Sequence, residues 1–99
     1  MRLTQDQVYA IRNSAVEVFG EGVKVWLFGS RVDDSKRGGD IDLLVQPSLS
    51  HVSTPLMSKM RFLSKLEKSL GERKVDVVVE ASVDTRPIVR VAHETGVLL

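Results

Sequence analysis

Two carboxylates one residue apart are the side chains of this sequence best suited to chemistry. Asp40 and Asp42 begin a run of β-branched and aliphatic residues, and nine residues separate them from the pair Gly29-Ser30. Side chains alternate across a β-strand, so both carboxylates should lie on one face, about 6 to 7 Å apart. Asp76 is the only acid inside a second apolar run. If the two runs form neighbouring strands, its carboxylate joins the pair.

Three carboxylates at one place predict a divalent cation. Like charges at short range raise at least one carboxyl pKa unless a cation lies between them. The sequence has no cysteine, and His51 and His93 have no partner at ligand spacing, so both are interpreted as incidental. Oxygen ligands alone favour Mg²⁺ over Zn²⁺. Asp40, Asp42 and Asp76 are therefore the predicted metal ligands. Each acid also has a plain alternative as a solvated strand residue.

Gly29-Ser30 is interpreted as a phosphate-binding turn. Glycine allows a tight turn and close approach of the backbone, and a helical turn opening at Ser30 would direct N–H groups at phosphate oxygens. Arg31 could neutralise a leaving pyrophosphate, with Lys36 and Arg37 as weaker candidates, although all three could equally be surface charges. No Walker motif is present.

The elements that position these residues alternate between helix and strand. Thr4 and Gln7 form a capping box, and a helix continues to Gly20. A second helix should begin at Pro55 after Thr54 and end at Gly71, and a third should run from near Pro87 to Gly96. The predicted strands are 23–28, 40–45 and 74–80, with a polar loop at 31–39 and an apolar tail at 97–99 that should dock on the protein.

The apolar positions of these helices predict their buried faces. The first should bury Val8, Ile11, Ala15, Val18 and Phe19. The second should bury Met57, Met60, Leu63, Leu66 and Leu70. The third should direct Ile88, Val91 and Ala92 inward. Trp26 and the methionines are expected in the core.

Composition limits the kind of protein. The 99 residues predict one domain spanning 1–99, and 42% hydrophobic with 27% charged residues is typical of a folded globule. A net charge of +1 argues against a nucleic-acid partner. No stretch resembles a signal peptide or a membrane span, and the lack of cysteine fits a cytoplasmic protein. The tail and the second helix could support a homodimer.

Phe28-Gly29-Ser30-Arg31, the spacing to Asp40-Ile41-Asp42, and the later Val75-Asp76-Val77 together resemble the minimal nucleotidyltransferases of the DNA polymerase β superfamily. Within that superfamily the chain is most similar to the short antitoxins paired with HEPN-domain toxins. The resemblance implies an α+β, polymerase β-like fold with a mixed sheet of three or more strands flanked by helices. It also implies Mg²⁺, ATP as cosubstrate, and transfer of AMP to a tyrosine hydroxyl of the HEPN toxin.

Carried over to this sequence, the resemblance assigns Gly29 and Ser30 to the triphosphate and Asp40 and Asp42 to the metals. Asp76 would be a further ligand or would position the attacking hydroxyl. Two metal ions are expected to promote in-line attack on the α-phosphate. Similar proteins often have ten residues between the Gly-Ser and the first aspartate and a glycine soon after the arginine, whereas here the gap is nine and Val32-Asp33-Asp34 follow Arg31. Two alternatives therefore remain: an antitoxin that binds nucleotide and masks its partner, or transfer to a small molecule or RNA end.

Overall fold

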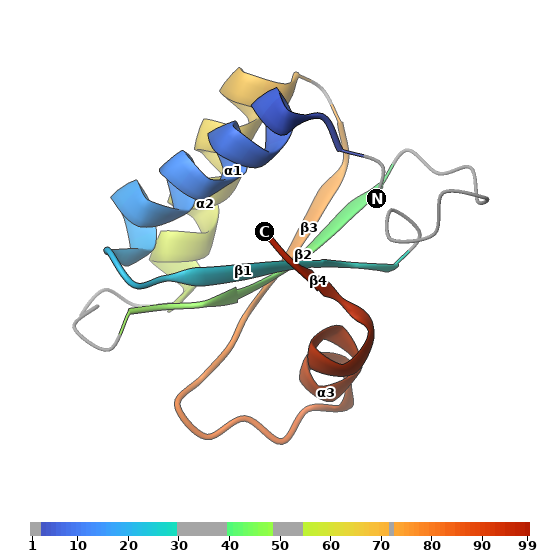
Figure 1. The fold of residues 1–99 in the computed structure, drawn as a ribbon. Coiled ribbons are helices and arrows are strands. Elements are labelled where there is room, and N and C mark those ends of the chain that lie inside the picture. The colour runs from blue at the N-terminus through green and yellow to red at the C-terminus, as the bar shows by residue number, and fades with distance from the viewer. Residues whose placement is uncertain (1–2, 30–39, 49–54, 72) are drawn as a thin grey trace.

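The computed structural model describes residues 3–29, 40–48, 55–71 and 73–99 (Figure 1). The helices are α1 (Gln5–Phe19), α2 (Pro55–Leu70) and α3 (Pro87–Thr95), and the strands are β1 (Lys24–Phe28), β2 (Ile41–Gln46), β3 (Val75–Val79) and β4 (Val97–Leu98). The predicted loop 31–39 and the cap at Thr54 lie outside the described residues. Each predicted helix and strand is confirmed to within one or two residues.

The four strands form one mixed sheet in the order β3-β2-β1-β4. β1 pairs antiparallel with both β2 and β4, whereas β2 and β3 are parallel. The α+β fold with a mixed sheet is therefore confirmed. The expected docking of the tail takes a form that was not predicted: it is a strand, since Val97 and Leu98 pair with β1 and the Leu99 N–H donates to the Val25 carbonyl at 2.9 Å.

Helices α1 and α2 cover one face of the sheet (Figure 1). The main core lies between them and the sheet, and Phe19 and Phe62 meet edge to face at its centre with ring centroids 5.4 Å apart. Its buried members from the strands are Val25, Leu27, Ile41, Leu43, Val45 and Val77. The predicted inward positions of α1 are confirmed, with Val8 only half-buried. Its capping box is also present: Gln7 N–H donates to Thr4 Oγ1, and Thr4 N–H donates to Gln7 Oε1.

Helix α3 covers the opposite face. A smaller buried cluster joins it to the sheet: Phe28, Leu44, Val89 and Ala92, with Trp26 and Val78 packed against them. Leu44 and Val78 share a strand face with Asp42 and Asp76, because residues two apart point the same way. Asp42 and Asp76 therefore lie on the same face of the sheet as α3, next to the area that α3 covers.

The segment leading to α3 is fixed by an aspartate and an arginine. Asp84 accepts hydrogen bonds from the Ala81 N–H at 3.0 Å, the Arg86 N–H at 3.1 Å and the Arg86 guanidinium at 2.6 Å. The same guanidinium donates to the Val79 carbonyl at 2.7 Å. These bonds connect the end of β3 to the first turn of α3.

The predicted buried faces of α2 and α3 were partly wrong. Met57 and Met60 are 60% and 61% exposed, and the buried residues of α2 are Ser58, Phe62 and Leu66. These three residues are four apart, which places them on one stripe of the helix against α1. Met57 precedes Ser58 by one residue and Met60 follows it by two, so both methionines point outward. In α3, Ala92 is buried as expected, but Ile88 and Val91 are exposed and Val89 takes the inward position. Trp26 is half-buried.

Candidate active site

Asp42 and Asp76 lie side by side on adjacent parallel strands. They are paired residues in the β2–β3 register, near the strand beginnings. Neighbouring strands lie about 4.8 Å apart, and paired residues direct their side chains to the same face. Asp42 is half-buried and Asp76 is exposed. The expectation that the third strand would bring Asp76 to the pair depended on β3 lying next to β2, and that neighbourhood is what the structure shows.

The Asp42 carboxyl is in an electrostatically unfavourable place. Its pKa is raised, first by burial, then by the charge of Asp76 and then by that of Asp40, while Lys74 acts in the opposite direction. Burial disfavours the ionised form because the carboxylate loses water, and the two neighbouring acids add repulsion. Burial and these two acids together outweigh Lys74, so the ionised form of Asp42 is disfavoured.

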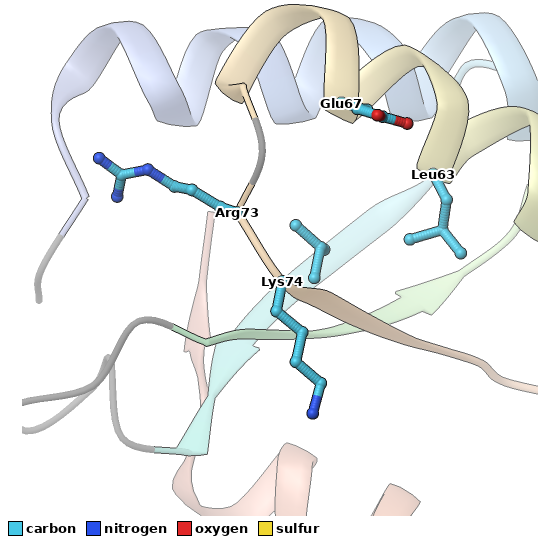
Figure 2. A pocket seen from close by; sticks show the side chains of 5 residues that line it. Leu63, Glu67, Arg73 and Lys74 are labelled. Atoms are coloured by element: carbon cyan, nitrogen blue, oxygen red, sulfur yellow. The ribbon is translucent and has the colours of Figure 1, made fainter.

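Lys74 forms an ion pair with Asp40. Its Nζ lies 3.9 Å from Asp40 Oδ2, and both side chains are half or more exposed, so the ion pair is weak. The Lys74 carbonyl accepts a hydrogen bond of 3.0 Å from the Ile41 N–H, which holds the two strand beginnings together. Figure 2 shows the Lys74 side chain extending from the start of β3 away from α2.

Gly29 is required where it stands. Its φ is +77°, in the left-handed region that side chains disfavour. A Cβ built on Gly29 would lie 2.3 Å from Asp42 Oδ2 and 3.2 Å from Asp42 Cγ. The register explains this proximity, because Asp42 is paired with Phe28, the residue before the glycine. The backbone of Gly29 has the conformation that a tight turn requires, and it lies directly against the Asp42 carboxylate. Ser30, Arg31, Lys36 and Arg37 lie outside the described residues.

The donor set fits a hard cation. Among the described residues, no three histidine, aspartate or glutamate side chains are grouped so that they could hold a metal as they stand. Asp40 lies beside Lys74 instead. Burial raises the pKa of Asp42, and the charges of Asp76 and Asp40 raise it further, while carboxylate oxygens with phosphate oxygens are the ligands that Mg²⁺ prefers. Asp42 and Asp76, with Asp40, are the residues that would hold it.

A polar cluster that the sequence did not predict lies at the other end of the same strands. Glu80 contacts His93 Nε2 and accepts a hydrogen bond of 2.7 Å from Gln46 Nε2. The His93 ring also meets Trp26 edge to face, with centroids 4.5 Å apart. His93 is thus not incidental, because it attaches α3 to the sheet. Gln46 and Glu80 lie an even number of residues from Asp42 and Asp76, so all four side chains point to the same face of the sheet. This alternation was the signal in the sequence that could have predicted the cluster.

No helix in the described part of the chain has the length and apolarity needed to cross a membrane. A search of curated proteins found no match. A family model described as a nucleotidyltransferase domain matches residues 8–99, a range that contains the Gly29 turn and all three aspartates. With the mixed sheet and the alignment of Asp42 with Asp76, this places the chain in a family of transferases: it belongs to the nucleotidyltransferase domain family.

Proposed function

We propose that this protein transfers AMP from ATP to a hydroxyl group of a partner protein in a Mg²⁺-dependent reaction. Transfer of a nucleotidyl group follows from the family. The observation that carries the proposal is the alignment of Asp42 with Asp76 beside the turn at Gly29. This arrangement combines oxygen ligands for a cation with a backbone turn open to a phosphate chain.

The aspartates have separate roles in this proposal. Asp42, partly shielded from water, and Asp40 at the strand entrance hold the cation. Asp76 is the outermost of the aligned pair and is exposed, so it faces the acceptor. When bound, the cation would offset the charge of the phosphates and lower the pKa of the attacking hydroxyl. Because a carboxylate on a cation has a low pKa and is a poor base, Asp76 acts as a ligand and positioning group.

The reaction balances without a further reactant. The acceptor oxygen forms a bond to the α-phosphorus of ATP, and the bond from that phosphorus to the bridging oxygen of pyrophosphate breaks. Pyrophosphate leaves with the electron pair, and the hydroxyl proton passes to water. Lys74, beside Asp40, is the described cation best placed to offset charge on the departing phosphates.

The acceptor we propose is a tyrosine of a HEPN-domain toxin, with this protein acting as its antitoxin. Support comes from the motif resemblance: Gly29-Ser30-Arg31, the pair Asp40 and Asp42, and Asp76.

Labelled ATP tests the proposal directly. The protein, the product of the neighbouring gene and ATP labelled in the α-phosphate are incubated with and without Mg²⁺. We expect Mg²⁺-dependent label on the partner, reduced on the order of 10²-fold or more by Asp42→Asn or Asp76→Asn. Asp6→Asn, which changes an exposed acid in the first turn of α1, is the matched control. Neutralisation of the partner that survives both site variants without label would show masking instead.

A further inference from the structure

We propose that the free edge of β3 binds an extended segment of the acceptor polypeptide and so places its hydroxyl next to Asp76. This inference rests on the function proposed above and adds how the acceptor is held. β3 is the terminal strand of the sheet order β3-β2-β1-β4. In the described part of the chain, no strand pairs with its outer side.

The hydrogen bonds at the two ends of β3 show which backbone groups face outward. The Ile41 N–H donates to the Lys74 carbonyl at 3.0 Å, and the Glu80 N–H donates to the Val45 carbonyl at 2.8 Å. Residues 74 and 80 therefore direct their backbone groups toward β2. Because these groups alternate along a strand, the even-numbered residues between them also face β2, and the odd-numbered residues face the free edge.

The first half of this edge is open. Arg86 covers the other end, since its guanidinium donates to the Val79 carbonyl at 2.7 Å. Among the described residues, none pairs with the outward N–H and carbonyl groups of Val75 and Val77, which can serve as donors and acceptors for an added strand. An unpaired edge of β-branched residues is a template for pairing with another chain.

An added strand would bring a side chain to Asp76. The backbone of Asp76 faces β2, so the residue opposite it on an antiparallel added strand forms a non-hydrogen-bonded pair, with Cα atoms about 4.5 Å apart and side chains close together. That side chain lies on the face of α3, as Asp42 does on the other side of Asp76. A serine, threonine or tyrosine at this position would present its hydroxyl at the aspartates.

The neighbouring side chains of the segment would meet a hollow on the other face. This hollow, about 400 Å³ in volume, lies between α2 and the start of β3 and is lined by Leu63, Glu67, Arg73, Lys74 and Val75 (Figure 2). The residue opposite Val75 points toward it, because side chains alternate between faces. Backbone pairing thus supplies affinity, and the hollow selects the adjacent side chain.

The charge around the hollow favours an acidic segment. Arg73 and Lys74 are both exposed, and Glu67 is the single acid among the lining residues. In Figure 2 the two cationic side chains extend in different directions from the start of β3, so an acidic residue at the end of the segment that lies opposite the start of β3 would meet one of them. The occupant we infer is an extended, apolar segment with a central hydroxyl residue and an acidic residue at the end that lies opposite the start of β3.

A short peptide tests this inference: a central tyrosine with two valines on each side and a glutamate at the carboxyl end, which antiparallel pairing places opposite Arg73. In amide NMR spectra of the full chain, we expect the peptide to shift and protect the N–H signals of Val75 and Val77. With Mg²⁺ and α-labelled ATP, its tyrosine should become labelled. N-methylation of the two valines next to the tyrosine removes the donors that face β3, and it should lower peptide affinity and labelling at least tenfold. N-methylation of the tyrosine, whose N–H points away, is the matched control.

The outcomes separate the two proposals. If the peptide methylated on both valines binds and is labelled as well as the parent, edge pairing is wrong while adenylyl transfer stands. Pairing at Val75 and Val77 without any label supports the docking edge and removes the proposed transfer. Concentration-dependent shifts of the same amides in the protein alone, with a dimer in sedimentation, would identify a second copy as the occupant and overturn the inference.

Discussion

Asp42 and Asp76 occupy the same register position of two parallel strands, so the sheet itself holds two carboxylates next to each other. Backbone pairing sets this proximity, and neither side chain can move far from the other without loss of the β2–β3 ladder. Like charges directly opposite on a sheet destabilise it. The arrangement therefore costs folding stability and is consistent with a site that a cation completes.

The first prediction concerns that cost. Asp42→Asn should raise the Tm of the protein measured without Mg²⁺, because it removes a charge that burial, Asp76 and Asp40 all disfavour. Thermal unfolding followed by circular dichroism measures the change. Glu21→Gln, at an exposed turn residue, removes a charge away from the aspartates and should leave the Tm nearly unchanged. An Asp42→Asn protein less stable than the parent would contradict the prediction.

The pH dependence of this difference follows from the raised pKa of Asp42. The folded protein binds a proton at Asp42 more readily than the unfolded chain does. Its stability is therefore favoured at low pH and declines as pH rises through the folded-state pKa. The Tm advantage of Asp42→Asn should be largest at neutral pH, shrink as pH falls through the raised folded-state pKa, and reach its minimum by about pH 4, the ordinary aspartate pKa. An advantage independent of pH would exclude this cause.

A second prediction isolates the contact between Gly29 and Asp42. Gly29→Ala places a side chain at a φ of +77° and its Cβ against Asp42, whereas Gly71→Ala places one at a φ of +80° with no atom within 4 Å. Gly71→Ala should cost about 1 to 3 kcal/mol in free energy of unfolding, the typical penalty for such backbone. Gly29→Ala should lower the free energy of unfolding by more than this, because its Cβ would also clash with the Asp42 carboxylate.

Asp42→Ala tests whether the additional destabilisation by Gly29→Ala, relative to Gly71→Ala, comes from the Asp42 carboxylate. It removes the carboxylate that the new methyl group would meet, so the double variant should lose the excess. Urea unfolding of the four proteins in this cycle gives the coupling energy. Equal costs at Gly29 and Gly71, or no coupling with Asp42, would show that only the backbone conformation matters.

Much of the arrangement of the candidate site could be predicted from the sequence because strand periodicity is local. The alternation of Asp40-Ile41-Asp42 and Val75-Asp76-Val77 determines which side chains share a face, and the glycine after Phe28 marks the turn. The alignment of Asp42 with Asp76 is different, because it depends on strand order and register, which are set by long-range packing. From the sequence, Asp76 was expected beside Asp42 only if the two strands were neighbours, and β2 and β3 are paired.

The errors also have a physical cause. Helix α2 has apolar residues on more than one side, and the stripe that is buried is the one containing Ser58 and Phe62, set by packing against α1. A hydrophobic pattern alone cannot choose between stripes one residue apart. The short strand β4 escaped prediction because two residues carry no periodicity, and pairing with β1 decides their conformation.

A third prediction concerns Lys74, which competes with a cation for Asp40. Lys74→Met should tighten binding of Mg²⁺ alone, because the ammonium 3.9 Å from Asp40 no longer offsets the acidic charge. Stability should change by less than about 0.5 kcal/mol, since both side chains are well exposed. Titration with Mg²⁺ followed by NMR measures the affinity. Lys68→Met, in the last turn of α2, is the control, and weaker Mg²⁺ binding by Lys74→Met would refute competition.

A fourth prediction concerns Asp84, whose pKa is held well below its usual range by the Arg86 guanidinium and then by the Ala81 N–H. The folded protein favours the ionised form, so the stability that Asp84 supplies is present above the unfolded-state pKa and is lost as pH falls toward the folded-state value. Asp84→Asn should therefore lower the Tm at neutral pH, and this deficit should narrow progressively below about pH 4. Because Arg86 also holds the Val79 carbonyl, the variant should expose the end of β3 to faster amide exchange at neutral pH. Thermal unfolding between pH 2 and 7, with Asp6→Asn as a control, measures the Tm deficit and its dependence on pH. A Tm deficit that stays constant over this range would show that Asp84 acts through shape alone and not through its charge.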